Sequence, residues 1–315
     1  MVLPLFVSVC ASRNRSFFLG LQIESKRSPR RELESIKRHV MSSFQVRQEI
    51  QPISLQIVSA ERFDPKKDLS SSIVMSQSWF ITGANRGIGF EIVKIAASQG
   101  YTVFAGARNP ANASALNQLA AQYPDIHIVK LASGSASDAE AAATVVEHTT
   151  GSLDVVIANA GIADNWQQIT DVDIDSVREH FEVNTVGTLI LFQALYPLLV
   201  KGQTRKFVTI SSNSASIGAI FPFPHTAYGA SKAALNFITQ AIHSEHKAEG
   251  FIAFPIHPGF VTTDMGIAGS KAFDTSFMVP LTPEQSAKAV FDKVDSATKE
   301  DSGRFWVYDG TELAW

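Results

Sequence analysis

Residues 79–89 read Trp79-Phe-Ile-Thr-Gly-Ala-Asn-Arg-Gly-Ile-Gly89, an apolar run that leads directly into a glycine-rich loop. The pattern predicts a buried strand over 79–82 and, after the loop, a helix over 90–98. Glycines let the backbone approach a pyrophosphate, and a helix N-terminus offers free N–H groups and a positive dipole end. The order of strand, loop and helix therefore predicts a dinucleotide site. Its candidate residues are Gly83, Asn85, Arg86, Gly87, Ile88 and Gly89.

The second predicted strand, 101–105, is followed by Gly106-Ala-Arg108. Enzymes that prefer NAD usually carry an acidic residue near this point, which hydrogen-bonds the ribose 2′-hydroxyl. This sequence has no acid there, and offers Arg108 and, inside the glycine loop, Arg86. Because a guanidinium binds phosphate in bidentate fashion, the two arginines favour the 2′-phosphate of NADP(H).

Further apolar runs predict strands at 126–131, 153–158 and 207–210, with predicted helices between them. The run at 153–158 ends in Asn159-Ala-Gly161, and the run at 207–210 ends in Ser211-Ser-Asn-Ser214. In open α/β sheets, ligands bind outside the carboxyl ends of the strands, so both segments are candidates for a ligand site. The alternation predicts a single α/β domain with a doubly wound, mostly parallel sheet of about seven strands.

Tyr228 and Lys232 lie four residues apart in a predicted helix over 227–239. That spacing places both side chains on one helix face. A phenol titrates near pH ~10, and a neighbouring ammonium lowers this pKa. A tyrosine tuned in this way can exchange a proton with an alcohol oxygen near neutral pH. Asn184 lies on an otherwise apolar helix predicted over 176–200 and, if buried, must be hydrogen-bonded.

The composition excludes several classes of protein. The chain has 315 residues, 45% hydrophobic and 18% charged, with a net charge of −3, so nothing favours nucleic acid as the main partner. No stretch reaches the ~20 apolar residues of a membrane span. The single cysteine, Cys10, excludes an intrachain disulfide and fits a reducing compartment such as the cytoplasm. His243 and His246 lack further patterned ligands, which predicts a solvated helix face and no metal site.

Residues 1–74 differ from the rest, being rich in Ser and Arg without a strand–helix alternation. Three interpretations are open: a targeting peptide, a solvated tail, or an artefact of a start codon placed upstream of Met75. We favour a disordered or non-native extension ahead of a complete domain at 75–315, with a basic helix of low stability possible at 31–46.

Together with His257-Pro-Gly-Phe-Val-Thr-Thr263, these motifs resemble the short-chain dehydrogenase/reductase (SDR) family over residues 75–315. The resemblance implies a Rossmann-type fold and an NADP-dependent oxidoreductase acting on CH–OH or C=O groups. It implies that Tyr228 is the general acid and that Lys232 lowers its pKa and contacts the nicotinamide ribose. The further cofactor contacts that it implies are Asn159, Ala160, Gly161, Tyr228, Lys232, Pro258, Gly259, Val261 and Thr263.

The same resemblance implies that Ser212 polarises the substrate carbonyl, with Ser214 as an open alternative, and that Asn184 maintains the proton relay. Ala132 and Ser133 stand where the family often has an Asp that holds the adenine. Residues 265–278 stand at the family's substrate lid, and we expect a loop there. A homodimer or homotetramer formed through the long helices is also implied.

Segments 205–212, 228–236 and 308–315 further resemble fungal ketoreductases of the norsolorinic acid ketoreductase type, which are NADPH enzymes of polyketide pathways that include aflatoxin biosynthesis. We therefore expect reduction of a ketone on an aromatic polyketide or related secondary metabolite to a secondary alcohol. The alternatives are a broad carbonyl reductase for small aldehydes and ketones, and a non-catalytic dinucleotide-binding regulator.

Overall fold

The computed structural model describes residues 76–220, 222–272, 274–276 and 278–315, together with three strands in the N-terminal segment. The chain divides into two compact units, Met1–Met75 and Ser76–Trp315. The two units are described separately.

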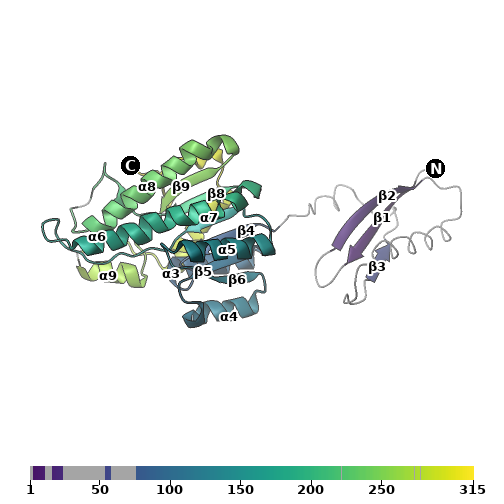
Figure 1. Ribbon diagram of the computed structural model, residues 1–315, viewed down its shortest axis with the longest axis horizontal. Helices are drawn as coiled ribbons and strands as arrows, with labels where there is room; N and C mark the ends of the chain where they lie inside the picture. Colours follow the sequence, from purple (N-terminus) through teal and green to yellow (C-terminus); the bar gives the residue numbers. More distant parts are fainter. Residues whose placement is uncertain are drawn as a thin grey trace. The chain divides into compact units, whose positions relative to one another are not determined.

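The larger unit contains a seven-stranded sheet with strand order β10-β9-β8-β7-β4-β5-β6, and its neighbouring strands are parallel (Figure 1). This confirms the doubly wound α/β sheet predicted from the sequence. The strands are β4 Ser78–Thr82, β5 Thr102–Ala107, β6 Ile126–Lys130, β7 Val155–Ala158, β8 Lys206–Ile210, β9 Ile252–His257 and β10 Trp306–Val307.

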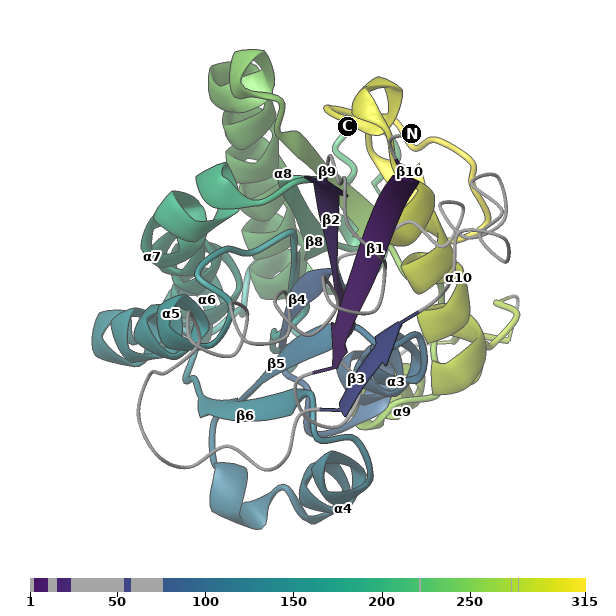
Figure 2. The same ribbon diagram turned by 90° about the vertical axis from the view of Figure 1, so that its right-hand side faces the viewer.

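Helices cover both faces of the sheet (Figure 2). One face packs against α3 Gly87–Ser98, α4 Ser114–Gln122 and α10 Pro283–Ser296. The other packs against α5 Ala136–Thr149, α7 Gly187–Lys201 and α8 Thr226–His246. Short 3-10 turns are η2 Pro110–Asn112, η4 Asn213–Ala215, η5 Lys247–Glu249 and η6 Lys299–Asp301.

The direction in which strands are added changes between β4 and β7. From β4 the chain adds β5 and β6 on one side, then crosses to add β7 to β10 on the other. Such a switch point opens a crevice at the carboxyl ends of the strands, where ligands bind in folds of this kind. The loops after β4, β7, β8 and β9 carry most of the predicted site residues, and they all meet this edge of the sheet. The others are Arg108 after β5, Asn184 in the helical run 174–201, and Tyr228 and Lys232 in α8.

The helix predicted over 176–200 has three parts: α6 Ile174–Phe181, the π-helical turn η3 Glu182–Val186, and α7. By length and composition the run 174–201 could cross a membrane, with a mean hydropathy of 1.6 over its most apolar window. Core helices share this property, and here Leu191, Leu195 and Leu199 pack in the core against the sheet. We therefore describe the run as a core helix.

Residues 265–278, which we expected to form a loop, contain the helix α9 Asp264–Ala272. The expectation was wrong because Gly266 and Gly269 weaken the sequence signal for a helix. Thr263 supplies the local compensation: its hydroxyl oxygen accepts from the Gly266 N–H at 3.2 Å, and its carbonyl accepts from the Ile267 N–H at 2.8 Å.

The smaller unit contains three strands, β1 Leu3–Cys10, β2 Ser16–Ile23 and β3 Ser54–Ile57. They form an antiparallel sheet of order β2-β1-β3, in which Leu3 pairs with Ile23 and Val7 with Ile57. The sequence pattern did not predict these strands. The basic helix considered at 31–46 lies outside the described residues.

Candidate active site

The glycine loop after β4 is tied to the turn after β7. The Thr82 hydroxyl oxygen accepts from the backbone N–H groups of Asn159 and Ala160, at 2.9 and 2.8 Å. The Asn159 amide in turn donates to the Thr82 carbonyl at 2.9 Å. Gly83 has φ +63°, and a Cβ there would lie 3.0 Å from the Ala160 Cα. The two segments predicted to hold the dinucleotide therefore form one rigid corner of the crevice.

The first turn of α3 is arranged for an anion. Gly87, Ile88 and Gly89 form this turn, no side chain caps it at Arg86, and it contains no acidic residue. A helix N-terminus of this kind presents unpaired backbone donors and the positive end of the helix dipole. The glycine loop and this turn therefore fit the pyrophosphate of a dinucleotide.

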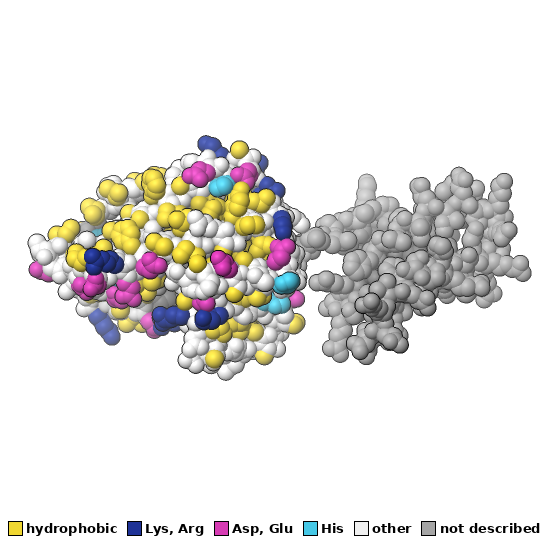
Figure 3. Space-filling model, viewed as in Figure 1, with side chains coloured by type: hydrophobic (Ala, Val, Ile, Leu, Met, Phe, Trp, Pro, Cys, Tyr) yellow, Lys and Arg dark blue, Asp and Glu magenta, His cyan; other side chains and the backbone are white. Residues whose placement is uncertain are grey.

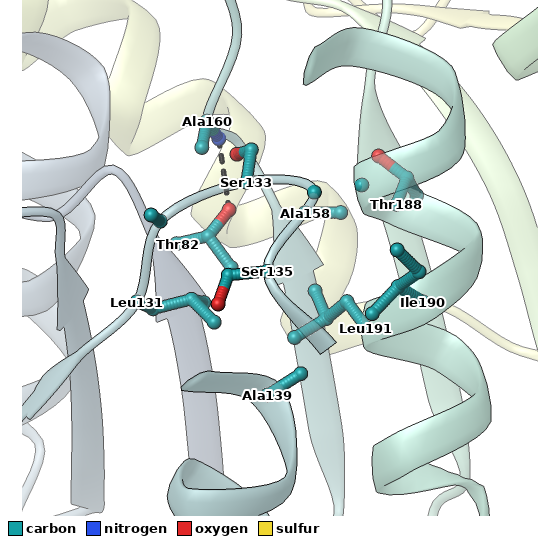
Figure 4. A pocket seen from close by; sticks show the side chains of 13 residues that line it. Thr82, Leu131, Ser133, Ser135, Ala139, Ala158, Ala160, Thr188, Ile190 and Leu191 are labelled. Carbon is teal, nitrogen blue, oxygen red and sulfur yellow. Dashed lines mark hydrogen bonds between the residues drawn. The ribbon is translucent and has the colours of Figure 1, made fainter. Parts of the chain in front are cut away.

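Figure 4 shows a small pocket between the ends of β4, β6 and β7 and the start of α7. Thr82 lies in it beside the turn at Ala160, and Ser133 and Ser135 approach from the loop after β6. The N–H of Ala132, at the position where the family often has an Asp, donates to the Asp138 carboxylate at 3.0 Å. The carboxylate near this loop therefore comes from α5 rather than from the end of β6.

The two arginines expected at the 2′-phosphate are both exposed. The Arg86 guanidinium donates to the Asp264 carboxylate at 2.8 Å, across from the start of α9, and both side chains are about three-quarters exposed, 73% and 75%. No hydrogen bond or ion pair holds Arg108 in the described part of the chain. Asn85 is exposed in the same loop.

Ser212 lies close enough to Tyr228 to influence its pKa. Ser212 follows β8 and is oriented by the Ser214 N–H, which donates to its hydroxyl oxygen at 3.1 Å. Burial raises the pKa of Tyr228, and the hydrogen bond with Ser212 lowers it in part. On balance the pKa of Tyr228 therefore lies above its ordinary value, and the lowering expected from Lys232 stays a prediction. Ser212, rather than Ser214, is the serine beside the tyrosine.

Lys232 is buried behind the tyrosine. Its ammonium donates to the Ile210 carbonyl at 2.8 Å and lies 5.9 Å from the centre of the Tyr228 ring. Burial lowers the pKa of Lys232 to about 8. The ammonium therefore sits in the interior with a carbonyl, and not a carboxylate, as its hydrogen-bond partner.

Asn184, in the π-helical turn, is fully hydrogen-bonded. Its Oδ1 accepts from the Ile162 N–H at 2.8 Å, and its Nδ2 donates to the Ile162 carbonyl at 3.0 Å and the Ser231 hydroxyl at 2.9 Å. A Cβ on Gly161 would lie 2.9 Å from this Oδ1 and 3.4 Å from the Lys232 Nζ. Asn184 and Lys232 thus approach each other across a position that must be glycine.

A large cleft opens above Tyr228 and Ser212, with an empty volume of about 850 Å³ when the part open to solvent is counted. Among the predicted cofactor residues, Ile88, Pro258, Gly259, Val261 and Thr263 line it. Much of the remaining wall is apolar or aromatic, and none of the described lining residues carries a charged side chain. Of the other apolar and aromatic lining residues, Phe260 lies in the predicted turn 257–263, and Met265 and Met278 end the segment expected at the substrate lid. Sequence analysis did not identify Ala163, Trp166 and Phe223.

The histidines differ from the expectations in part. His243 and His246 are half-buried, and each has a partner, Ser302 and Glu249 respectively, so the predicted solvated face was wrong. Within the described residues no group of three or more His, Cys, Asp or Glu side chains could hold a metal. His257 lines the cleft, and burial lowers its pKa to about 4.

Comparisons with known proteins define the class. The family model of the short chain dehydrogenase matches residues 77–272. An uncharacterized oxidoreductase of Schizosaccharomyces pombe is 37% identical over 246 residues, covering 75% of this chain and 97% of the relative. Norsolorinic acid ketoreductase nor1 of Dothistroma septosporum is 35% identical over 250 residues, covering 76% and 92%.

Among solved structures, the NADPH-bound carbonyl reductase from chicken fatty liver has a TM-score of 0.69 and 31% identity, covering 76% of this chain and 99% of that chain. The chain belongs to the short-chain dehydrogenase/reductase family. It is an oxidoreductase resembling carbonyl reductases, and its fold binds a nicotinamide dinucleotide.

The burial of Lys232 predicts how the free energy of unfolding depends on pH. Its pKa in the folded chain is about 8, against an ordinary value of 10.5. Between these values the unfolded chain binds more protons at this site, so the free energy of unfolding should rise with pH across this window. The rise should reach up to about 3 kcal/mol, at roughly 1.4 kcal/mol per pK unit.

Urea unfolding of the protein and of Lys232→Met, at matched pH values from 7.5 to 10, measures this. The variant should lack the rise, because methionine has no titrating group. Parallel stability curves for the two proteins would show that the lysine is not buried as described.

Proposed function

We propose that this protein is an NADPH-dependent ketoreductase that reduces a ketone on an aromatic polyketide, or a related secondary metabolite, to a secondary alcohol. The observation that carries the proposal is the pair Ser212 and Tyr228 at the base of an uncharged cleft with aromatic walls. The similarity to norsolorinic acid ketoreductase nor1 supports the substrate class. When bound, the cofactor supplies a hydride.

In this proposal each of the four polar side chains has one task. The Tyr228 hydroxyl gives its proton to the carbonyl oxygen, and the Ser212 hydroxyl hydrogen-bonds that oxygen as negative charge develops on it. The Lys232 ammonium stabilises the phenolate once the proton has left. Asn184 keeps the lysine and the turn after β7 in place through its bonds to Ile162 and Ser231.

The cofactor would be held along the edge of the sheet. The glycine loop and the α3 N-terminus suit its pyrophosphate, Asn159, Ala160 and Gly161 its adenine side, and the segment from Pro258 to Thr263 its nicotinamide end. We assign the 2′-phosphate to Arg86 and Arg108. Similarity to the NADPH-bound carbonyl reductase from chicken supports NADP(H) over NAD(H).

A broad carbonyl reductase is the second candidate, because of the same 31% identity to that carbonyl reductase. It predicts turnover of small aldehydes and ketones with little preference. The wide aromatic cleft favours the first candidate, since a small carbonyl compound would leave most of its apolar wall uncovered.

Consumption of NADPH and of NADH, with hydroxyanthraquinone ketones and with small aldehydes, tests the proposal. We expect turnover with NADPH and the anthraquinone ketones, and a loss of at least roughly a hundredfold in Tyr228→Phe, which cannot act as general acid. Turnover of small carbonyls alone would discard the polyketide assignment. A preference for NADH would overturn the role given to Arg86 and Arg108.

The ion pair of Arg86 leads to a second prediction. Asp264 holds the guanidinium that we assign to the 2′-phosphate, so a bound phosphate must displace this carboxylate. Asp264→Asn should therefore lower the Kd for NADPH roughly two- to fivefold, which matches the small energy of exposed ion pairs. Fluorescence titration of the cofactor measures this, with NADH as the control ligand that lacks the phosphate. An equal change for both cofactors would contradict the assignment.

We further propose that the chain acts in the cytoplasm and forms a homodimer or homotetramer. Hydrophobic side chains gather over the face formed by α7 and α8 (Figure 3). Val186, Leu189 and Phe237 on this helical face are 38%, 36% and 76% exposed. Light scattering should give at least a dimer, and Phe237→Glu should dissociate it. A monomeric wild-type protein would refute the association.

A further inference from the structure

His225 lies at the base of the same cleft and has no role in the scheme above. It immediately precedes α8, three residues before Tyr228, and is 7% exposed. It lines the cleft together with Ser212 and Tyr228. A ring nitrogen here is close to the position where the substrate carbonyl would react.

The hydrogen bond made by Nδ1 of His225 determines whether Nε2 is a donor or an acceptor. The Nδ1 atom lies 2.7 Å from the Phe223 carbonyl oxygen. A carbonyl can accept a hydrogen bond but cannot donate one, so Nδ1 carries the proton. In the neutral imidazole, Nε2 is then an acceptor with a free lone pair.

This Nε2 atom has no partner within the described part of the chain, and neither Ser212 nor Ser214 donates to it. The buried and unpartnered side-chain atoms there are Asn236 Nδ2, Gln240 Oε1 and His257 Nδ1. Nε2 of His225 is not among them, so it keeps access to the cleft. The edge of the ring formed by Cδ2 and Nε2 passes over Gly229, where an added Cβ would lie 2.6 Å from Cδ2 and 3.2 Å from Nε2. The absence of a side chain at Gly229 therefore leaves room beside Nε2.

An acceptor that has no partner among the described residues is a selective feature of an uncharged, largely apolar cleft. When a bound ligand displaces water from it, the acceptor is left unsatisfied unless the ligand brings a donor. We propose that Nε2 of His225 accepts a hydrogen bond from a hydroxyl group of the ketone substrate. The substrate class is then an uncharged aryl ketone that carries a hydroxyl, and His225 selects it. This inference rests on the proposed ketone reduction.

The substrate's hydroxyl must lie at a definite distance from its carbonyl. His225 and Tyr228 are separated by about one helical turn, and side chains with this spacing have Cβ atoms roughly 5–6 Å apart. A hydroxyl directly hydrogen-bonded to its own carbonyl would be too close to satisfy both residues. The meta and para isomers of a hydroxyaryl ketone are therefore the better ligands.

Two substitutions of His225 test the Nε2 acceptor separately from the hydrogen bond that Nδ1 makes to the Phe223 carbonyl. His225→Asn keeps an N–H near the position of Nδ1, which can still donate to the Phe223 carbonyl, but it has no atom at the position of Nε2. His225→Gln places an amide oxygen near Nε2 and loses the Nδ1 donor. The probes are the three hydroxyacetophenones, their methyl ethers, which cannot donate, and unsubstituted acetophenone. The kcat/KM with NADPH is measured for each.

In the wild-type protein we expect the preferred hydroxyacetophenone to exceed its methyl ether by roughly tenfold, as the loss of one buried hydrogen bond implies. In His225→Asn this ratio should fall to about one, while the ether and acetophenone change less than about twofold; His225→Gln should keep part of the preference. An unchanged ratio in His225→Asn, or an equal loss for all ketones, would overturn the inference.

Calorimetric binding of the same ketones to the cofactor-free protein separates this inference from the proposed function. If neither these ketones nor the hydroxyanthraquinone ketones are turned over, the proposed function fails. Tighter binding of the hydroxyl form than of the ether, abolished in His225→Asn, would still support the role of His225. Equal binding of the two forms by the wild-type protein would refute it.

Discussion

The burial of the Lys232 ammonium is the constraint around which the site is built. A charge in the interior must be hydrogen-bonded and cannot be crowded. The Ile210 carbonyl supplies the bond, and Gly161 leaves the space. Asn184, in the π-helical turn, lies beside Gly161 as well. Its hydrogen bonds join Ile162, in the segment after β7, to Ser231 on α8. Strand end, turn and helix are thus fixed relative to one another by the need to accommodate one cation.

Much of the fold could be predicted because its signals are local. An apolar run, a glycine loop and a helix follow one another within about twenty residues, and the order of such units dictates a parallel sheet. The helix predictions are wrong where a helix contains residues that disfavour helical structure. Helix α3 begins at Gly87 and α9 contains Gly266 and Gly269, although glycine is a poor helix former. In α3 the packing of Ile92, Val93 and Ala96 in the core outweighs propensity, whereas in α9 the local hydrogen bonds to Thr263 do so.

The candidate site was predictable in its parts but not in its geometry. Tyr228, Lys232 and Ser212 belong to recognisable motifs, and they do lie together. The apolar wall could be predicted only in part: Met265 belongs to the segment expected at the substrate lid, whereas Trp166 and Phe223 lie in loops without a motif. The pKa of Tyr228 was also beyond sequence reasoning, since burial and the bond to Ser212 act on it in opposite directions. A sequence gives spacing along the chain, whereas burial depends on what packs around a group.

The cleft therefore has two walls of different origin. Its polar side comes from β8 and the first turns of α8, which the sheet and the buried lysine hold rigidly. Its apolar side comes from the loops around Trp166 and Phe223 and from α9. Surface loops tolerate substitution far better than packed strands do. The side chains that carry out the reaction are thus physically separate from those that select the substrate. His225 lies between the two groups: it immediately precedes α8, and its Nδ1 is hydrogen-bonded to the carbonyl of Phe223 in the neighbouring loop.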